Sequence, residues 1–392
     1  MISLVALVTV LTVSIGGYSQ IMGAAIKYQQ NHQIAMKANE LANALILSTG
    51  YPLGWGQSNN TPSAFGLQDP EVGGYSLSPF SIQRLLSPQA QVYYNETDLW
   101  YSNNSLDWGG SLLVPVTNAV NYTTAAKLLG TNGSYGFQLT ITPTLNISIS
   151  EVDLNPLKLN VEVKGLGRAL RGATLNYFLY HAIPSNYSFP SIEVFSGTNQ
   201  TDSTGSAVLL FSSVDGSQYA YSIIVYASLS GLTGVGYYSR ETVTNNQIIP
   251  FVENFENRTV LLAHSWDGSP ATLHFNATFF ILTQNFDLSR IQLANSSGLV
   301  NSGTGYPYAR VQIPTQDAGI LIVAYRKEND YGIVMMPWGV STLGFPVTFG
   351  GDSSSADWVA IELRQVTVSK ISYQVKLAVW STKDFQQWGN NP

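Results

Sequence analysis

Serine, histidine and aspartate occur close together at one place in this sequence. His264 and His274 lie in neighbouring apolar stretches, and Ser265 and Asp267 lie in the polar segment between them. These residue types can form a nucleophilic triad, and histidines beside a carboxylate can bind zinc. The polar turn of a β-hairpin accounts for the same residues. We therefore expect a turn here rather than a catalytic or metal site.

Other catalytic signatures are absent or weak. The remaining histidines, His32 and His181, are isolated, and the sequence contains no HExxH, GxxxxGK[ST] or GxSxG motif and no EF-hand loop. Residues 164–167, KGLG, have the glycines of a phosphate-binding loop. Such a loop needs the N-terminus of a helix behind it, whereas a β-rich segment follows here. We expect a turn.

The sequence offers carboxylates but no cysteines as further metal ligands. Asp202, Asp215 and Glu253 could bind calcium, but they lack the spacing of a calcium loop. The sequence has no cysteine, which excludes a disulfide framework, a thiolate nucleophile and cysteine-ligated zinc or iron–sulfur clusters. We therefore predict no catalytic residue, no metal site and no cofactor, and a chain that is not an enzyme.

The composition is poor in charge. The 392 residues, enough for two or three domains, are 45% apolar and only 11% charged. Soluble chains average about 25% charged residues, so Ser, Thr, Asn, Gln and Tyr must hydrate this surface. That pattern is typical of an extracellular protein. The net charge of −6 with only 18 Lys plus Arg provides no basic stripe, and we expect no nucleic-acid partner.

The first 26 residues form the most informative segment. They contain no charged side chain, and a helix of this length spans about 39 Å, enough to cross a bilayer. Apolar residues lie on every side of that helix, so it must be surrounded by lipid or by similar helices. A secretory signal normally carries basic residues ahead of its apolar run, whereas the apolar run starts at Met1 in this sequence. Both a chain whose basic leader was removed and a plain N-terminal anchor fit this pattern.

The helical pattern continues beyond the apolar segment. Ile34, Ala38, Leu41 and Leu45 are spaced to form one apolar face, and the opposite face is rich in amides. The run Gly50, Tyr51, Pro52 is a strong helix stop. We predict one helix of about 48 residues, about 72 Å long. Its second half must pack against the globular part of the chain or against neighbouring copies.

Residues 1–55, including ELANALILSTGYPLGWG, resemble type IV pilins and archaeal pilin-like surface proteins. Val5 stands where bacterial pilins usually carry a glutamate, which disfavours a bacterial assignment more than an archaeal one. The resemblance implies processing by a prepilin-type peptidase, a pilus assembly machinery, and filaments with this helix in their core. The residues that would pack there are Leu4, Val8, Leu11, Ile15, Gly16, Gly17, Ile21, Gly23 and Ala24.

The remainder of the sequence has the pattern of β-sandwiches. Short β-branched and aromatic runs such as FQLTIT, LKLNVEV and AYSIIVYAS alternate with turn signals from Phe137 onward. Part of it resembles bacterial Ig-like and carboxypeptidase-regulatory modules, which act as spacers or adhesive units. The residues that carry this resemblance are Gly167, Leu170, Gly172, Ala173, Thr201, Asp202, Gly205 and Ala207.

These patterns predict an α+β fold with four segments. A hydrophobic and then amphipathic helix occupies residues 1–50. An aromatic and Gly/Asn-rich segment, 51–136, packs with a C-terminal β domain, 246–392. An Ig-like β-sandwich, 137–245, is inserted between them. No internal repeat is evident in the sequence.

Sequons for N-linked glycosylation are frequent. Eleven Asn-x-Ser/Thr sites occur, all after the helix, about twice the number expected by chance. Sugars would hydrate a surface with few charges, and we expect N-linked glycans at these sites. Their asparagines are Asn59, Asn95, Asn103, Asn121, Asn132, Asn146, Asn186, Asn199, Asn257, Asn276 and Asn295.

We therefore expect a pilin-like structural subunit of an extracellular, glycosylated, homopolymeric cell-surface filament for adhesion or cell contact. The subunit would be inserted in the membrane before assembly. A different class of protein remains open: a monomeric surface adhesin or carbohydrate-binding receptor with one N-terminal membrane anchor.

Overall fold

The structure is a computed structural model of the whole chain. It describes residues 2–382 with the exception of 86–90, 95–96, 103–112, 132, 185–188, 241–247, 265–273, 284–287, 297–299, 302–306, 328–329 and 340–345.

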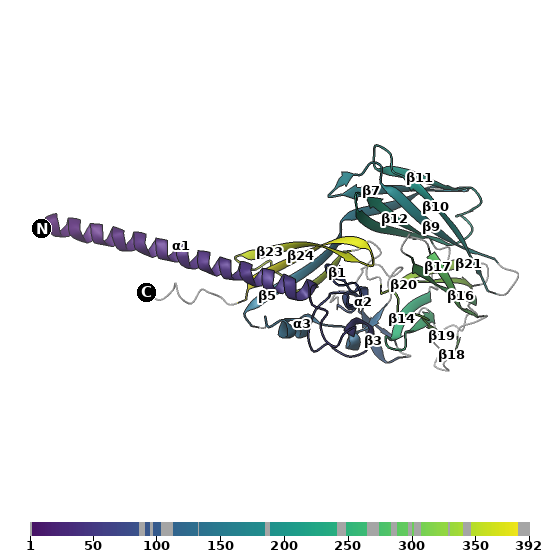
Figure 1. Cartoon of the computed structure of the whole chain (residues 1–392), viewed down its shortest axis with the longest axis horizontal. Helices are drawn as coiled ribbons and strands as arrows, with labels where there is room; N and C mark the ends of the chain where they lie inside the picture. Colours follow the sequence, from purple (N-terminus) through teal and green to yellow (C-terminus); the bar gives the residue numbers. More distant parts are fainter. Residues whose placement is uncertain are drawn as a thin grey trace.

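One long helix leads into a body made of β-strands, which confirms the predicted fold class. Helix α1 covers Ile2–Ile46, and its N-terminal half projects away from the rest of the molecule (Figure 1). No proline interrupts it, and Gly50 follows with a φ of 72°, a conformation that glycine adopts without strain. The helix therefore ends where the sequence pattern places its stop.

The C-terminal half of α1 lies on a five-stranded sheet, which we call the head sheet. Its order is β1-β23-β24-β5-β22, and only β1 pairs in parallel. Helix α1 contacts β23 and β24. The strands are β1 (Ser76–Leu77), β5 (Tyr135–Pro143), β22 (Val347–Gly350), β23 (Val359–Val368) and β24 (Ile371–Ser381).

The segment after α1 folds around one buried arginine. The guanidinium of Arg84 donates to the carbonyl oxygens of Trp55, of Ser58 and Asn60 at 2.8 Å each, and of Asn118 at 2.7 Å. It also lies 5.2 Å from the centre of the Trp55 ring. Burial lowers the pKa of Arg84 to about 10, so the side chain keeps its charge at neutral pH. Arg84 thus ties together three parts of an irregular segment, at Trp55, at Ser58 to Asn60 and at Asn118.

Short elements complete this part of the chain. They are the helices α2 (Pro79–Gln83) and α3 (Tyr122–Leu128), the 3₁₀ turns η1 (Trp55–Gln57) and η2 (Val116–Asn118), and the strands β2 (Gln91–Tyr94), β3 (Leu99–Ser102) and β4 (Val114–Pro115).

Residues 145–240 form a two-sheet sandwich, which we call the first sandwich. One sheet has the order β11-β7-β6, with β8 added to β7, and the other has the order β10-β9-β12-β13. A sheet of three main strands faces a sheet of four, and the chain crosses between the two sheets. This is an Ig-like arrangement. The strands are β6 (Leu145–Leu154), β7 (Leu157–Gly165), β8 (Arg168–Ala169), β9 (Thr174–Ile183), β10 (Ser191–Gln200), β11 (Ser206–Phe211), β12 (Tyr221–Leu229) and β13 (Leu232–Arg240).

Residues 248–338 form a second sandwich. Apart from one short strand added to each sandwich, its strands have the same spatial order as those of the first. Its sheets are β14-β15-β19-β18 and β17-β16-β20-β21. The chain therefore contains a structural repeat that its sequence does not reveal. The strands are β14 (Ile248–Asn254), β15 (Thr259–His264), β16 (His274–Leu282), β17 (Leu288–Ser296), β18 (Val300–Asn301), β19 (Pro307–Gln312), β20 (Gly319–Lys327) and β21 (Asp330–Trp338).

The two sandwiches pack against each other through the sheets β10-β9-β12-β13 and β17-β16-β20-β21. Strand β21 contacts β9, β12 and β13, and side chains such as Tyr180 and Phe280 meet there, with ring centres 4.9 Å apart. The central strand β12 is covered on both faces, which explains why it has seven consecutive buried residues rather than an alternating pattern. One core joins this contact with the head sheet and α1.

Strand pairing divides the chain differently from the four predicted segments. Strand β5, residues 135–143, pairs with β24 and β22 of the head sheet and not with the first sandwich. Residues 347–381 return to that same sheet, so both sandwiches lie within one insertion between β5 and β22. The physical reason is that β5 completes the sheet on which α1 is buried.

His181 is buried where the two sandwiches meet. Its ring packs against Tyr219, which in turn packs against Tyr331 of β21. Neither ring nitrogen has a hydrogen-bond partner among the described residues, and the Glu193 carboxylate lies 3.9 Å from Nδ1. Burial lowers the pKa of His181 from 6.5 to about 4, and the negative charge of Asp215 opposes that shift only in part.

We predict that acid weakens the fold through His181. A histidine whose pKa is lower in the folded chain binds fewer protons there, so the free energy of unfolding should fall as the pH decreases from about 6.5 to about 4. The loss is about 3 kcal/mol at most. Denaturant titrations at several pH values measure it, and His181→Gln should flatten the slope. The same substitution at the exposed His32 is the control, and a His181→Gln slope equal to that control contradicts the prediction.

Candidate functional site

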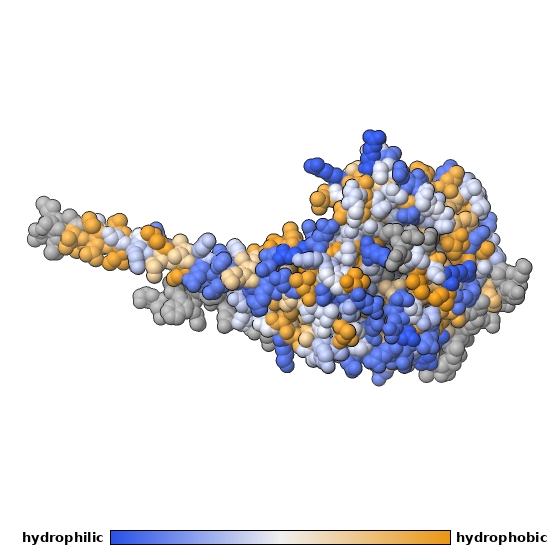
Figure 2. All heavy atoms as spheres, in the orientation of Figure 1, coloured by the Kyte–Doolittle hydropathy of each residue, from blue (hydrophilic) through white to orange (hydrophobic). Residues whose placement is uncertain are grey.

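The projecting half of α1 is the most unusual surface of the molecule. Every side chain from Leu7 to Tyr28 is exposed, and most are apolar: Leu7 is 64% and Ile21 is 70% exposed. Figure 2 shows this apolar surface along the helix. Fully burying one large aliphatic side chain is worth about 1.5–3 kcal/mol. A helix exposed in this way requires a non-aqueous environment or a partner.

The sequence predicted which residues of this surface would pack in a filament. Val8, Leu11, Ile15, Ile21 and Ala24 are exposed, and nothing lies within 4 Å of a Cβ built on Gly16, Gly17 or Gly23. Leu4 lies in α1, but its side chain is outside the described part of the structure. These glycines leave flat places where another helix could approach closely. The role of the nine residues in packing stays a prediction.

Length and composition alone would allow α1 to cross a membrane. Leu7–Ile46 contains an apolar window long enough for a bilayer, and none of that window is buried in the molecule. An N-terminal apolar helix of this kind is compatible with a membrane anchor or a signal sequence, and so with a membrane or surface location.

The C-terminal half of α1 is fixed firmly to the head sheet. Ile34, Ala38, Leu41 and Leu45 are buried, as their spacing predicts. Arg364 of β23 donates to Asn39 Oδ1 at 2.8 Å. The helix end is held by the N–H of Leu67, which donates to the Leu45 carbonyl at 2.8 Å. The direction of the projecting half is therefore set by this attachment.

Close packing at the helix end leaves room only for glycine. A Cβ on Gly66 would lie 2.2 Å from the carbonyl oxygen of Ser48, and one on Gly50 would lie 2.6 Å from that of Ala64. The segment after the helix therefore packs directly against the backbone at the end of the helix.

Two of the four residues considered for catalysis, His264 and His274, lie in the described part of the structure. His264 ends β15 and His274 begins β16, and Ser265 and Asp267 lie outside the described residues. Among the described residues no three His, Cys, Asp or Glu side chains are placed to bind a metal ion.

The three carboxylates considered for calcium are each occupied elsewhere. Asp202 accepts the N–H of Thr204 at 2.7 Å within a turn. Asp215 accepts the N–H of Ser217 at 2.9 Å, and Glu253 pairs with Arg310 at 2.7 Å. Hydrogen bonds from neighbouring Ser, Thr and backbone groups lower the pKa of Asp202 and Asp215. These residues stabilise turns and strands at separate places.

The Gly-rich run 164–167 is a hairpin turn. Leu166 and Gly167 have φ values of 50° and 78°, and Gly165 pairs with Arg168 across the turn between β7 and β8. Two central residues with positive φ match the twist of the flanking strands. A strand follows instead of a helix, so the backbone offers no phosphate-binding N-terminus.

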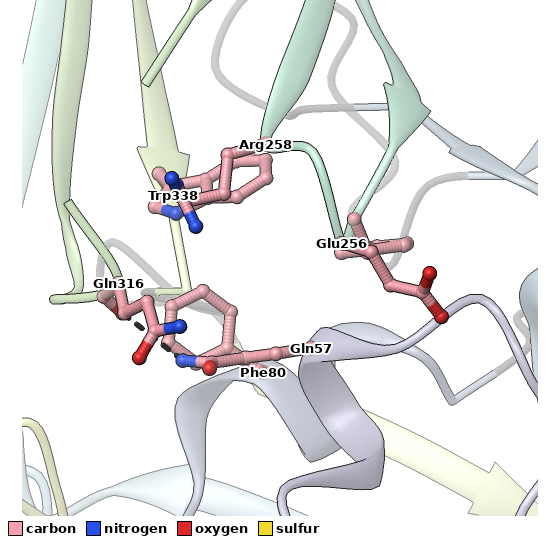
Figure 3. Close-up of a pocket in the computed structure, with 7 residues that line it drawn as sticks. Gln57, Phe80, Glu256, Arg258, Gln316 and Trp338 are labelled. Atoms are coloured by element: carbon pink, nitrogen blue, oxygen red, sulfur yellow. Dashed lines mark hydrogen bonds between the residues drawn. The ribbon is translucent and has the colours of Figure 1, made fainter. Parts of the chain in front are cut away.

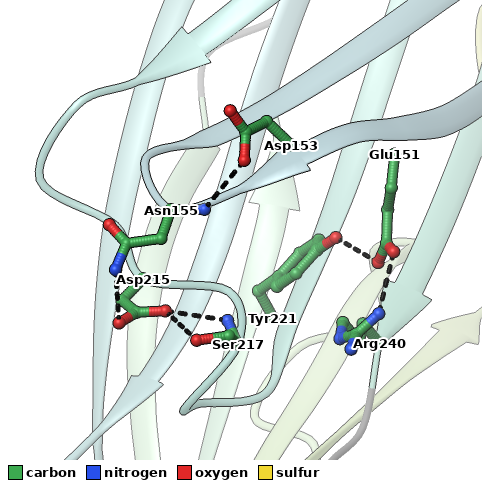
Figure 4. A network of polar contacts seen from close by, with 7 residues as sticks. All are labelled: Glu151, Asp153, Asn155, Asp215, Ser217, Tyr221 and Arg240. Carbon is green, nitrogen blue, oxygen red and sulfur yellow. Dashed lines mark hydrogen bonds and ion pairs between the residues drawn. The ribbon is translucent and has the colours of Figure 1, made fainter.

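A polar network links the two sheets of the first sandwich (Figure 4). Glu151 of β6 accepts from the hydroxyl of Tyr221 at 2.6 Å and from Arg240 Nη1 at 2.8 Å. Burial alone would raise the pKa of Glu151, but the hydrogen bonds from Tyr221, Tyr238 and Arg240 outweigh it, and the pKa is lowered. A carboxylate held ionised by three donors serves as a structural link rather than a general acid.

A small cavity lies between the segment after α1 and the second sandwich (Figure 3). Gln57 and Phe80 line one side, and Arg258, Gln316 and Trp338 line the other. Gln57 Nε2 donates to the carbonyl oxygen of Gln316 at 3.0 Å. The volume of about 30 Å³ fits about two water molecules, too little for a substrate.

Most of the sequon asparagines that the structure describes are accessible. Asn121, Asn146, Asn199 and Asn257 are exposed, and Asn59 is half-buried. Asn95, Asn103, Asn132 and Asn186 lie outside the described residues, as does the side chain of Asn295. Whether any of them carries a sugar stays a prediction.

Asn276 requires a correction. This side chain is only 4% exposed, and its Nδ2 donates to the carbonyl oxygen of Pro190 at 3.2 Å. Its Oδ1 accepts from Thr278 Oγ1 at 3.1 Å and from Gln292 Nε2 at 2.9 Å. A sugar on Nδ2 has no room in the folded chain, so Asn276 is a buried structural amide.

The sequence analysis missed one surface pair. Tyr93 of β2 and Trp100 of β3 face each other across a hairpin, with ring centres 5.5 Å apart, and Trp100 is 54% exposed. The Tyr93 hydroxyl donates to Asp98 Oδ1 at 2.5 Å. Both aromatics were visible in the sequence, but their pairing depends on strand register, which a weakly periodic segment does not reveal.

Comparisons with known proteins give no family. No family model and no curated protein matches the chain. A two-domain fibronectin type III segment of chicken tenascin is similar at 9% identity and a TM-score of 0.16, over 49% of this chain and 98% of that one.

Two larger solved structures are similar at the same low level. A Salmonella α2-macroglobulin mutant has 12% identity and a TM-score of 0.20 over 56% of this chain and 17% of its own. Red sea bream transglutaminase has 11% identity and a TM-score of 0.19 over 69% and 40%. These similarities are too low to assign the chain to a family. The sandwiches are identified as Ig-like by their strand order.

We predict that removing residues 1–28 makes the chain soluble without detergent. The deletion removes the exposed apolar surface and keeps Ile34 to Ile46, which belong to the core. Light scattering in detergent-free buffer should show a monomer for the truncated chain and aggregates for the full chain. Aggregation of both chains would contradict the assignment of this surface.

Proposed function

We propose that this chain is a structural subunit of a glycosylated extracellular filament, resembling archaeal type IV pilins. The projecting helices would bundle into the core of the filament, and the β-sandwiches would form its outer sheath. The observation that supports the proposal best is the contrast within α1. Its first half is apolar on every side and exposed, whereas its second half is buried on one face only.

A bundle of copies suits this helix better than a single anchor does. A bilayer needs about 20 residues, whereas α1 covers Ile2–Ile46 and continues rigidly into the head sheet. A rigid junction would hold every subunit at the same angle to a common axis. Association inside a membrane gains from close packing rather than from release of water, because lipid is as apolar as leucine. Gly16, Gly17 and Gly23 would permit that approach.

The partners follow from this proposal. Other copies of the chain would be the main partner, and the membrane would hold the subunit before assembly. A prepilin-type peptidase and a pilus assembly machinery would be required. The exposed sequons would carry N-linked glycans on the sheath.

We predict that Gly16→Leu with Gly17→Leu stops assembly but leaves the chain in the membrane. The added side chains keep the segment apolar and block close approach of helices. Electron microscopy of sheared filaments and a membrane fractionation measure the two outcomes. Val10→Leu is the matched control, since it adds volume at a position that is not a glycine. Normal filament yield from the double variant would refute the packing role.

A second candidate is a membrane-anchored adhesin that binds carbohydrate. The observation that favours it is the exposed pair Tyr93 and Trp100, with Asp98 beside it. An exposed aromatic face with a neighbouring hydrogen-bonding group suits a sugar ring, which has apolar faces and polar edges.

We predict for this candidate that Trp100→Ala weakens binding to a polysaccharide about tenfold, equal to about 1.4 kcal/mol. Retention on immobilised mannan, chitin and cellulose measures it. Trp358→Ala is the control, because Trp358 is also partly exposed. Equal retention of both variants would exclude Trp100 as the binding platform.

A further inference from the structure

The first sandwich has one strand edge without the usual protection. Among the described strands, β11 pairs only with β7, so its other edge has no strand partner there. Val208 and Leu210 on this strand are 55% and 57% exposed. Natural edge strands normally carry a charge, a proline or a bulge that prevents pairing with another chain. Ser206–Phe211, SAVLLF, contains no charge and no proline, and its pairing with β7 is regular.

Two residues of this edge, Val208 and Leu210, direct their backbone groups away from β7. In an antiparallel pair, alternate residues direct their N–H and C=O groups away from the partner strand. The Val208 carbonyl points outward in this way, because it accepts from Asn199 Nδ2 at 3.2 Å. Leu210, two residues further on, has the same orientation. An apolar strand with outward backbone groups is a template for a strand of a neighbouring subunit.

Asn199 lies directly at this edge and begins the sequon Asn199-Gln200-Thr201. It is exposed at the end of β10, which is the open edge of the opposite sheet. Its hydrogen bond to Val208 therefore bridges the two open edges of the sandwich. Glycosylated asparagine keeps one N–H on Nδ2, so the bond to Val208 is compatible with a sugar.

We propose that an N-linked glycan on Asn199 covers the open edge of β11 and prevents strand pairing between sandwiches. This inference rests on the glycosylated surface of the proposed function. The donor would be an oligosaccharide linked to a lipid phosphate. Asn199 Nδ2 forms a bond to the first carbon of the sugar, the bond from that carbon to the phosphate oxygen breaks, the lipid phosphate leaves with the electron pair, and a base takes one amide proton.

The fold also sets the time of the modification. The hydroxyl of Thr201, which the transferase must recognise, is buried: it donates to the Leu170 carbonyl at 2.5 Å and accepts the N–H of Ala173 at 2.9 Å. The sequon is therefore readable only before this sandwich folds. After folding, Asn199 and its sugar remain outside while the threonine closes the turn.

The experiment uses the full chain in detergent, made in a host that N-glycosylates secreted proteins. Peptide mass spectrometry should find a glycan on Asn199. Asn199→Gln should associate about tenfold faster in light scattering. Asn146→Gln, at an exposed sequon of β6, is the matched control and should stay monodisperse. Adding Leu210→Lys to Asn199→Gln should restore the monomer, because a lysine protects an edge strand.

Three results would overturn the proposal: an unmodified Asn199 peptide, an Asn199→Gln chain as monodisperse as the control, or association that Leu210→Lys does not reverse. Detergent keeps the chain out of filaments, so these results do not depend on assembly. Failure of the filament proposal is detected separately, through the glycine variants of α1.

Discussion

Burial of one face of α1 against the head sheet is the contact on which the rest of the arrangement depends. Ile34, Ala38, Leu41 and Leu45 enter the same core as β23 and β24. This contact fixes the direction of the helix axis, and the apolar first half therefore projects away from the body. A flexible tether in the same place would let that half fold back onto the body. The rigid attachment instead presents a long apolar rod in a fixed direction.

The local parts of this fold could be predicted from the sequence, because their signals are local. An uncharged segment followed by apolar residues three and four apart indicates a long helix, and β-branched runs between turn residues indicate strands. The partner of β5 could not be predicted in this way. Its neighbours β22 and β24 lie some 200 residues further along the chain, and no short pattern records such a pairing. The repeat of the two sandwiches is likewise a repeat of strand order and not of residues.

The candidate sites show the same division. A sequon specifies a modification from three residues but contains no information on burial, so Asn276 and Asn199 look alike in the sequence. Their surroundings separate them: Asn276 is enclosed by Pro190, Thr278 and Gln292, whereas Asn199 lies on an open edge. The role of Arg84 could not be predicted either, because the sequence around a single arginine does not show which carbonyl oxygens will contact it.

The pairing of β5 with β22 has a consequence for how such a chain can diversify. Val347 pairs with Ile141, so the points where the chain leaves and re-enters the head sheet are neighbours on adjacent strands. The two backbone connections of the insert therefore lie side by side, and its sandwiches also pack against the head sheet through the shared core. An exchange of this insert would break the backbone at only two neighbouring points, but it would also remove the contact of β13 with β24 and part of the core around α1. A change in the insert therefore has to preserve both the spacing of its two ends and the face that it packs against the head sheet.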